Sequence, residues 1–293
     1  MEYTTVQKYL EFCKIHKRLS PHSIRAYESD LQQYYKFGTS DVKSYITFLS
    51  KQIKKTNTLK RKIASLKSFY KYLEEEKLIT DNPFHRLRLS YREEKSLPKI
   101  ISRKDLKKVY HYAYHQMQTA KSQYSEMKAM RNLLLISLLL STGIRVSELC
   151  QLQLENIDLA NRNILILGKG RKERHLYIGN TETFSLLQSF ITTYCTNSTY
   201  LFTGMGNSNH LTEQSVRLML KNISQTLKLQ KYITPHMFRH SFATMLLDDG
   251  VDIRQIQHLL GHSTISVTQI YTQVSNSKQI EILSKHNPLS SIL

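Results

Sequence analysis

A charged segment with few apolar residues divides this chain near residue 90. The turn-forming run Asp81-Asn82-Pro83 ends a helical pattern, and most of the charged residues between it and Pro98 are arginine or lysine. A length of 293 residues is enough for two domains that each bury a core of their own. We therefore predict a helical domain over residues 1–88, an extended basic linker over 89–100 and a second domain over 101–293.

Helix start signals and apolar periodicity run through the first domain. Ser20-Pro21 supplies an N-cap and a first helical residue, and Asp41 opens a second helix. From about Thr58 to Glu76 apolar residues recur on one helical face. The opposite face of this helix carries five cations: Lys60, Arg61, Lys62, Lys67 and Lys71. A lysine-rich face is often only solvated, but in a lobe that is basic throughout we expect it to follow a phosphate backbone and bind DNA.

Helical patterns also dominate the second domain. Ser102 can cap its first helix, and helical periodicity fills residues 102–141, with a polar stretch at 115–130 that can contain a loop. Helices resume near Thr181 and continue to the end of the chain.

Two β-prone runs interrupt these helices. Residues 163–167 and 174–178 flank the sequence Gly168-Lys169-Gly170, which predicts a short antiparallel hairpin. The predicted fold class is therefore mainly α with a small antiparallel β-sheet.

The net charge points to a polyanionic partner. Lysine and arginine outnumber aspartate and glutamate by 42 to 23, which gives a formal charge of +19. The excess is shared by both predicted domains, so it is not a basic tail. Charge of this kind can simply keep a protein soluble, but two basic lobes fit a clamp around double-stranded DNA better.

Cysteine usage and hydropathy favour the cytoplasm. The three cysteines, an odd number without close spacing, predict neither a disulfide framework nor a zinc site. Charged residues interrupt the N-terminus, so it lacks the apolar core of a signal peptide. The longest apolar run, Leu133 to Leu140, is too short to span a membrane and predicts a buried helix.

The first candidate for the chemistry is Arg145. It follows Thr142-Gly143, a helix-ending signal, and so should lie at the start of the next helix, where an arginine can bind a phosphate bidentately. Glu148 lies three residues further on the same helical face and could hold the guanidinium group. Taken alone, this segment fits an ordinary surface Arg–Glu pair better than a phosphate site.

The second candidate is Lys169, which lies between two glycines in the predicted hairpin turn. A flexible ammonium group there could reach into a groove and give a proton to a leaving oxygen. Arg171, Lys172 and Arg174 are competing cations, and position alone does not choose among them.

The third candidate is the run His236-Met-Phe-Arg239-His240, which begins after Pro235. Helical spacing puts His236, Arg239 and His240 on one face, and a histidine with an arginine suits phosphate binding. Two histidines four residues apart also suggest a metal, but the glutamate of zinc-binding helices is missing and no further ligand is evident. We therefore expect no metal, and we interpret His240 as a buried, hydrogen-bonded support.

The fourth candidate is Tyr271, nine residues after His262. Gly261 ends a predicted helix at about 252–260, and Ser263-Thr264 can cap the helix that would carry the tyrosine. A phenol with its usual pKa of ~10 is a poor nucleophile. It needs a cationic pocket or a base, which the other candidates supply. Together the set has the groups for breaking and rejoining a phosphodiester bond.

In order and spacing these segments resemble the tyrosine site-specific recombinases, and most closely their Xer-like branch. The segments are Thr-Gly-Ile-Arg145-Val-Ser-Glu-Leu, Gly-Lys169-Gly-Arg-Lys-Glu-Arg, His236-Met-Phe-Arg239-His-Ser-Phe-Ala-Thr, Leu-Gly-His262 and Gln-Ile-Tyr271-Thr. The resemblance implies a C-shaped, two-domain DNA clamp, in which a helical, SAM-like core-binding domain precedes the catalytic domain.

The resemblance also implies a role for each residue. Tyr271 attacks the scissile phosphate and forms a 3′-phosphotyrosyl bond, and Lys169 protonates the leaving 5′ oxygen. Arg145, Arg239 and His236 stabilise the charge that develops on the phosphorane, while His262 bonds the phosphate and helps position the nucleophile. No metal or other cofactor is needed, because the phosphotyrosine conserves the bond energy.

Assembly is implied as well. The family acts as a homo-tetramer on two DNA sites and exchanges strands through a Holliday junction. In the Xer-like branch a C-terminal tail, here residues 274–293, docks into a neighbouring subunit. A start so close to the core-binding lobe argues for a simple recombinase that resolves dimers or cointegrates, although integration or excision, a second recombinase and accessory proteins all stay open.

Three other readings compete with this one. A type IB-like topoisomerase would use the same residues without pairing two sites. A non-catalytic architectural DNA-binding protein on the same fold would tolerate loss of Tyr271 and Arg145. A metal nuclease built on His236 and His240 would be inhibited by EDTA.

Overall fold

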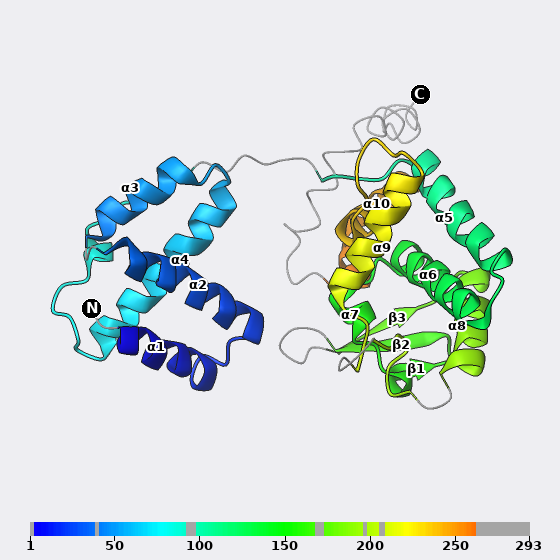
Figure 1. Ribbon diagram of the computed structural model, residues 1–293, viewed down its shortest axis with the longest axis horizontal. Coiled ribbons are helices and arrows are strands. Elements are labelled where there is room, and N and C mark those ends of the chain that lie inside the picture. Colours follow the sequence, from blue (N-terminus) through cyan, green and yellow to red (C-terminus); the bar gives the residue numbers. More distant parts are fainter. Residues whose placement is uncertain are drawn as a thin grey trace, which may run out of the picture. The chain divides into compact units, whose positions relative to one another are not determined.

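The computed structural model describes residues 3–38, 41–91, 98–167, 173–195, 198–204 and 209–261. The chain divides into two compact units, Met1–Ser96 and Leu97–Leu293. Figure 1 shows that the first unit is helical and that the second combines helices with one small sheet, as the sequence predicted.

Over residues 3–38 and 41–91, the first unit consists of four α-helices and a short 3-10 helix: α1 (Tyr3–Ile15), α2 (Pro21–Phe37), α3 (Val42–Gln52), α4 (Thr56–Glu75) and η1 (Pro83–His85). The predicted helix starts are confirmed. The Ser20 hydroxyl accepts a hydrogen bond from the backbone N–H of Ser23, with Pro21 as the first helical residue. The Asp41 carboxylate accepts the backbone N–H groups of Lys43 and Ser44.

The core of the first unit is rich in aromatic rings. The apolar face of α4 is buried as its periodicity predicted, and Phe69 from this face packs against Tyr9 of α1. Where α2 meets α4, the hydroxyl groups of Tyr34 and Tyr70 are hydrogen-bonded at 2.7 Å. This bond meets the polar requirement of two buried rings.

In the described part of the second unit the helices are α5 (Arg103–Gln118), α6 (Gln123–Thr142), α7 (Val146–Cys150), α8 (Thr181–Tyr194), α9 (Glu213–Thr226), α10 (Pro235–Asp248) and α11 (Ile253–Leu260), with a 3-10 turn η2 (Leu154–Asn156). Ser102 caps α5 as expected. The polar stretch between α5 and α6 contains the expected helix break.

The sheet has three antiparallel strands in the order β1 (Ile157–Asp158), β2 (Asn163–Leu167) and β3 (Glu173–Tyr177). The predicted hairpin is confirmed, and Ile166 pairs with Arg174 in its register. The two-residue strand β1 was not predicted, because it is too short to carry an alternating pattern.

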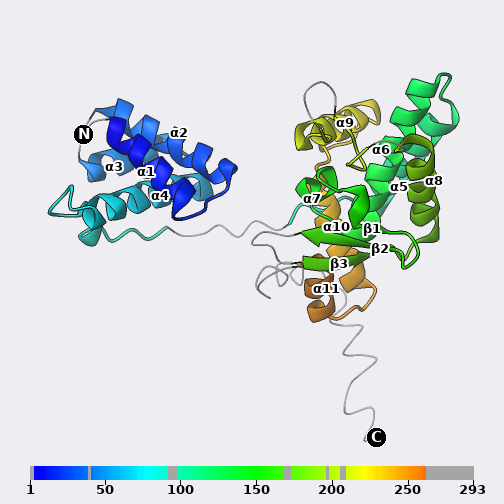
Figure 2. The same ribbon diagram turned by 90° about the horizontal axis from the view of Figure 1, so that it is seen from below.

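Helix α6 forms the centre of the second unit. Most side chains of the predicted apolar run Leu133–Leu140 are buried, and the helix packs against α5, α8 and α10 (Figure 2). Within the described residues, no helix combines the length and the apolar character that crossing a membrane requires. The buried α6 ends at Thr142, immediately before the candidate site.

Candidate active site

The turn between α6 and α7 positions the first candidate arginine. Gly143 ends α6 with φ +62°, a left-handed conformation that favours glycine. A Cβ atom on this glycine would lie 2.5 Å from Cδ1 of Phe242, so the position also requires the absence of a side chain. Arg145 then occupies the N-cap of α7, which confirms the predicted start of that helix.

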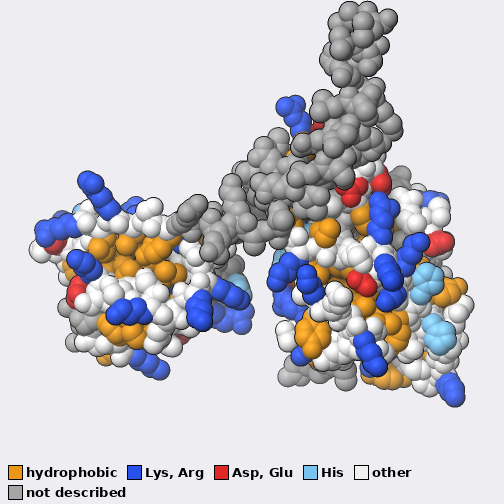
Figure 3. Space-filling model, turned by 90° about the horizontal axis from the view of Figure 1, so that it is seen from above, with side chains coloured by type: hydrophobic (Ala, Val, Ile, Leu, Met, Phe, Trp, Pro, Cys, Tyr) orange, Lys and Arg blue, Asp and Glu red, His pale blue; other side chains and the backbone are white. Residues whose placement is uncertain are grey.

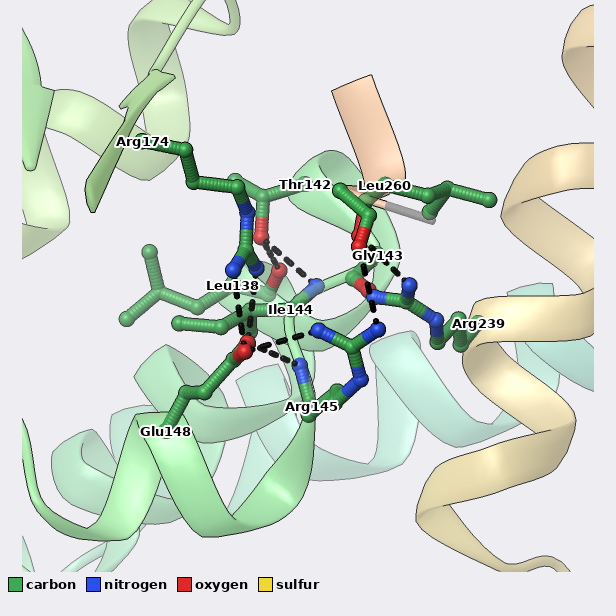
Figure 4. Close-up of polar contacts among 10 residues, drawn as sticks. Leu138, Thr142, Gly143, Ile144, Arg145, Glu148, Arg174, Arg239 and Leu260 are labelled. Atoms are coloured by element: carbon green, nitrogen blue, oxygen red, sulfur yellow. Dashed lines mark hydrogen bonds and ion pairs between the residues drawn. The ribbon is translucent and has the colours of Figure 1, made fainter. Parts of the chain in front are cut away.

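Glu148 holds Arg145 at two points, as the sequence suggested. Its Oε1 accepts a hydrogen bond from Nη1 of Arg145 at 2.8 Å, and its Oε2 accepts the Arg145 backbone N–H at 3.1 Å (Figure 4). The carboxylate therefore fixes both ends of the arginine.

A second arginine, Arg174 of β3, binds the same carboxylate. Its Nη1 lies 2.9 Å from Oε1 and its Nη2 lies 2.7 Å from Oε2 of Glu148, which is a bidentate pair. Sequence reasoning treated Arg174 only as a rival of Lys169 in the turn. Arg174 lies two residues before the buried Leu176 and therefore on the same face of β3, and this spacing was the available signal that its side chain faces the protein.

Burial and charge act in opposite directions on Glu148. Only 9% of its side chain is exposed, against 15% for Arg174 and 36% for Arg145. Burial by itself raises the pKa of Glu148, but the bonds and charges of Arg174, and then of Arg145, outweigh it and bring the pKa below its usual value. Glu148 is therefore ionised at neutral pH, and Arg145 remains the more exposed partner.

Arg239 ties together the ends of two helices. Its side chain is buried, and it donates from Nη1 to the carbonyl of Gly143 at 2.7 Å and from Nη2 to the carbonyl of Leu260 at 2.6 Å. Arg145 donates from Nη2 to the adjacent Gly261 carbonyl at 3.3 Å. Figure 4 shows the guanidinium groups of Arg145 and Arg239 side by side between these carbonyls. The fold thus brings two predicted phosphate-binding cations to one point.

The two histidines of α10 differ in environment. His236 is exposed in the first turn of the helix, and His240 is half-buried one turn later. Burial, and then the electrostatic effect of the neighbouring His236 and Arg239, lower the pKa of His240, so this imidazole is neutral at pH 7. No group of three His, Cys, Asp or Glu side chains within the described ranges could hold a metal ion.

Several predicted site residues lie outside the described residues: Lys169, Arg171, Lys172, His262 and Tyr271. Their roles stay predictions. Gly261 is the described residue nearest in sequence to both His262 and Tyr271. It ends α11 in a left-handed conformation with φ +63°.

The basic face of α4 is only partly a free surface. Arg61 and Lys62 both bind the buried carboxylate of Asp30, which also accepts the hydroxyl of Ser65. The Lys62 side chain is 15% exposed, whereas Lys67 is exposed and Lys60 is half-buried. Figure 3 shows further Lys and Arg side chains on the visible face of each unit. Lys62 therefore stabilises the fold of the first unit through its ion pair with Asp30, and little of its side chain is exposed to a ligand.

Comparison with protein families assigns both units. Residues 105–278 match the model described as phage integrase family. Residues 6–77 match the model described as phage integrase, N-terminal SAM-like domain.

Curated relatives resemble the chain over nearly its full length. A tyrosine recombinase of Agathobacter rectalis is 40% identical, with 97% of this chain and 96% of that protein aligned. The tyrosine recombinase XerC of Bacillus subtilis is 31% identical over 97% of this chain and 96% of its own length.

Solved structures share the fold. A crystal structure of XerA recombinase, 26% identical, aligns with a TM-score of 0.55 over 97% of this chain and 99% of that chain. The XerH site-specific recombinase in a post-cleavage complex with palindromic difH substrate, 24% identical, aligns with a TM-score of 0.71 over 94% of this chain and 82% of that chain.

Proposed function

This chain belongs to the phage integrase family and is a tyrosine site-specific recombinase, and from this we propose that it cleaves and rejoins double-stranded DNA with Tyr271 as the nucleophile. The observation that carries the proposal is the pair of guanidinium groups of Arg145 and Arg239. They converge at the C-terminal ends of α6 and α11, and α11 ends two residues before His262 in sequence.

These two cations suit a phosphate whose negative charge grows during reaction. Charge stabilisation by groups already in place needs no reorganisation at the moment of attack. Arg239 is fixed by two carbonyls, and Arg145 is fixed by Glu148 and the Gly261 carbonyl. His236, exposed in the first turn of the helix that carries Arg239, adds a further donor in the proposal.

In the proposed reaction, the Tyr271 hydroxyl gives up its proton to water, and its oxygen attacks the scissile phosphorus while the bond to the 5′ oxygen breaks. Lys169 gives the leaving 5′ oxygen its proton, and His262 bonds the phosphate and helps position the nucleophile. The product is a 3′-phosphotyrosyl bond with a free 5′-hydroxyl. Attack by a 5′-hydroxyl on this bond reverses the step and rejoins a strand. Arg171 and Lys172, close to Lys169 in sequence, bind nearby phosphates in the proposal. Lys60, Arg61, Lys62 and Lys67 of the first unit are proposed to do the same.

The proposal extends to assembly. Two DNA sites are paired by a homo-tetramer, strands exchange through a Holliday junction, and residues 274–293 dock into a neighbouring subunit. The proposed biological role is resolution of dimers or cointegrates, or integration and excision.

The test uses nicked duplex fragments taken from DNA that flanks this protein's gene. Wild type, Tyr271→Phe and the matched control Tyr124→Phe, an exposed tyrosine at the start of α6, are incubated with the fragments in EDTA. On a denaturing gel we expect a slow protein–DNA band from wild type and the control, and none from Tyr271→Phe. A covalent band from Tyr271→Phe would refute the assignment of the nucleophile. DNA binding without a wild-type band would favour the architectural alternative, and cleavage only without EDTA would favour a metal nuclease.

A further inference from the structure

We infer that Arg174 is a positioning residue for cleavage: through the shared carboxylate of Glu148 it holds the guanidinium group of Arg145 in place for the scissile phosphate. The inference rests on the proposed function. It concerns a residue that lies on β3, 26 positions from Glu148 in sequence.

The argument starts from how the carboxylate is used. Each oxygen of Glu148 accepts one bond from Arg145 and one from Arg174: Oε1 from both Nη1 atoms, and Oε2 from the Arg145 backbone and the Arg174 Nη2. A bidentate guanidinium fixes both the position and the plane of a carboxylate. Because Arg174 lies on β3, the sheet fixes the orientation of the Glu148 carboxylate to which Arg145 is hydrogen-bonded.

Arg174 also lies against the second attachment point of Arg145. A Cβ atom on Gly261 would come within 2.8 Å of Cδ and 3.0 Å of Nε of Arg174, so the Arg174 side chain packs on the end of α11. The carbonyl of this same glycine accepts Nη2 of Arg145. Arg174 therefore contacts both residues that accept hydrogen bonds from the Arg145 side chain, Glu148 and Gly261.

The charge of Arg174 is already matched by a carboxylate. Its Nη1 and Nη2 each donate to the ionised Glu148, whereas those of Arg239 donate to uncharged carbonyls. The Arg174 side chain is 15% exposed, against 36% for Arg145. In this inference Arg145 binds the phosphate, and Arg174 holds the Glu148 carboxylate that positions Arg145.

The experiment measures single-turnover formation of the covalent complex on a nicked site at saturating protein. The variants are Arg174→Met and Arg174→Lys, with Arg103→Met as the control, because Arg103 pairs with Asp249 on the surface. We expect Arg174→Met to lower the cleavage rate roughly 100-fold, the order of effect that misplacing a reacting group by about 1 Å produces. Arg174→Lys should give a smaller loss, since a lysine keeps the charge without the bidentate geometry. The control should cleave like wild type.

A double-mutant cycle separates positioning from a general structural effect. In a Glu148→Gln background, Arg174→Met should cost little more, because the carboxylate through which Arg174 acts has already lost its charge. Melting temperatures of all variants identify any that have unfolded.

A pH profile gives a second readout. Among the described residues, the charged groups that face Glu148 are Arg174 from β3 and Arg145 from the start of α7. Removing Arg174 takes away the largest influence that lowers the Glu148 pKa, so Arg174→Met should lose cleavage at a higher pH than wild type as pH falls. Combining Arg174→Met with Glu148→Gln should abolish this difference.

The outcomes are distinct. A wild-type protein that forms no covalent complex would overturn the proposed function, and the role of Arg174 with it. Two other results would overturn the role of Arg174 alone. One is an Arg174→Met variant that cleaves as fast as an active wild type, and the other is a loss of cleavage rate from Arg174→Met that is just as large in the Glu148→Gln background.

Discussion

Gly143 occupies a position where both backbone conformation and packing exclude a side chain. Its φ of +62° is left-handed, and an added Cβ would lie 2.5 Å from Cδ1 of Phe242 and 2.9 Å from Cδ2 of Leu260. These two side chains pack in the small cluster between α10 and α11. Gly143→Ala should therefore strain the turn after α6 and push apart the helices that carry the site.

The cost can be worked from three glycines of the second unit. Gly179 has no left-handed φ and open space around it, so Gly179→Ala should change stability by at most about 1 kcal/mol. Gly250 has φ +89° with nothing within 4 Å, so its alanine variant carries only the conformational cost of about 1–2 kcal/mol. Gly143 adds overpacking of about 1–3 kcal/mol to that cost. The total for Gly143→Ala is about 2–5 kcal/mol.

Thermal unfolding of the full chain measures these differences. For a domain of this size each kcal/mol lowers the melting temperature by about 2–4 °C, so Gly143→Ala should lose about 4–20 °C and Gly250→Ala about 2–8 °C. Gly38→Ala, in the open turn after α2, should lower only the melting temperature of the first unit and so identifies which thermal transition belongs to that unit. A Gly143→Ala variant as stable as Gly250→Ala would refute the packing argument. Because the Gly143 carbonyl accepts Nη1 of Arg239, Gly143→Ala should also cleave DNA more slowly than Gly250→Ala.

Two further predictions concern buried carboxylates. The pKa of Glu148 lies below its usual value of 4.5, so the stability that its charge contributes is complete above that pH and is lost as pH falls through the lower folded-state pKa. The difference in unfolding free energy between wild type and Glu148→Gln, measured by denaturant titration, should stay constant from neutral pH to about pH 5 and shrink below it; a constant difference down to about pH 3 would contradict this. Asp30→Asn should destabilise the first unit by about 3 kcal/mol, because Lys62 would be left with an uncompensated charge in a largely buried site. Asp81→Asn, which breaks an exposed pair with Arg86, should cost less than about 1 kcal/mol, and equal losses from both variants would count against the role of burial.

Much of the fold was predictable from sequence signals between residues close together in the chain. The caps at Ser20, Asp41 and Ser102 were predictable because each involves groups two or three residues apart, whose geometry the backbone sets. The pairing of Arg145 with Glu148 was predictable for the same reason, since residues three apart share a helical face. The β2–β3 hairpin followed from two short β-prone runs around a glycine-rich turn.

Long-range partners were not predictable in this way. Arg174 reaches Glu148 across 26 residues, and Arg239 reaches Gly143 across 96. Apolar faces predict that helices pack but not which faces meet, because leucine and isoleucine side chains are nearly interchangeable in a core. The sequence could therefore place Arg174 near a turn but could not identify the carboxylate that it binds.

The sequence by itself predicted most of the elements, the basic character of both lobes and a set of candidate residues with the chemistry for phosphodiester exchange. The tertiary structure decided how two of those residues are held: Arg239 by the carbonyls that end α6 and α11, and Arg145 by a carboxylate shared with β3. The physical reason is that a helix end leaves its last carbonyls without partners, and only the packing of α6, α10 and α11 brings those ends to a single arginine.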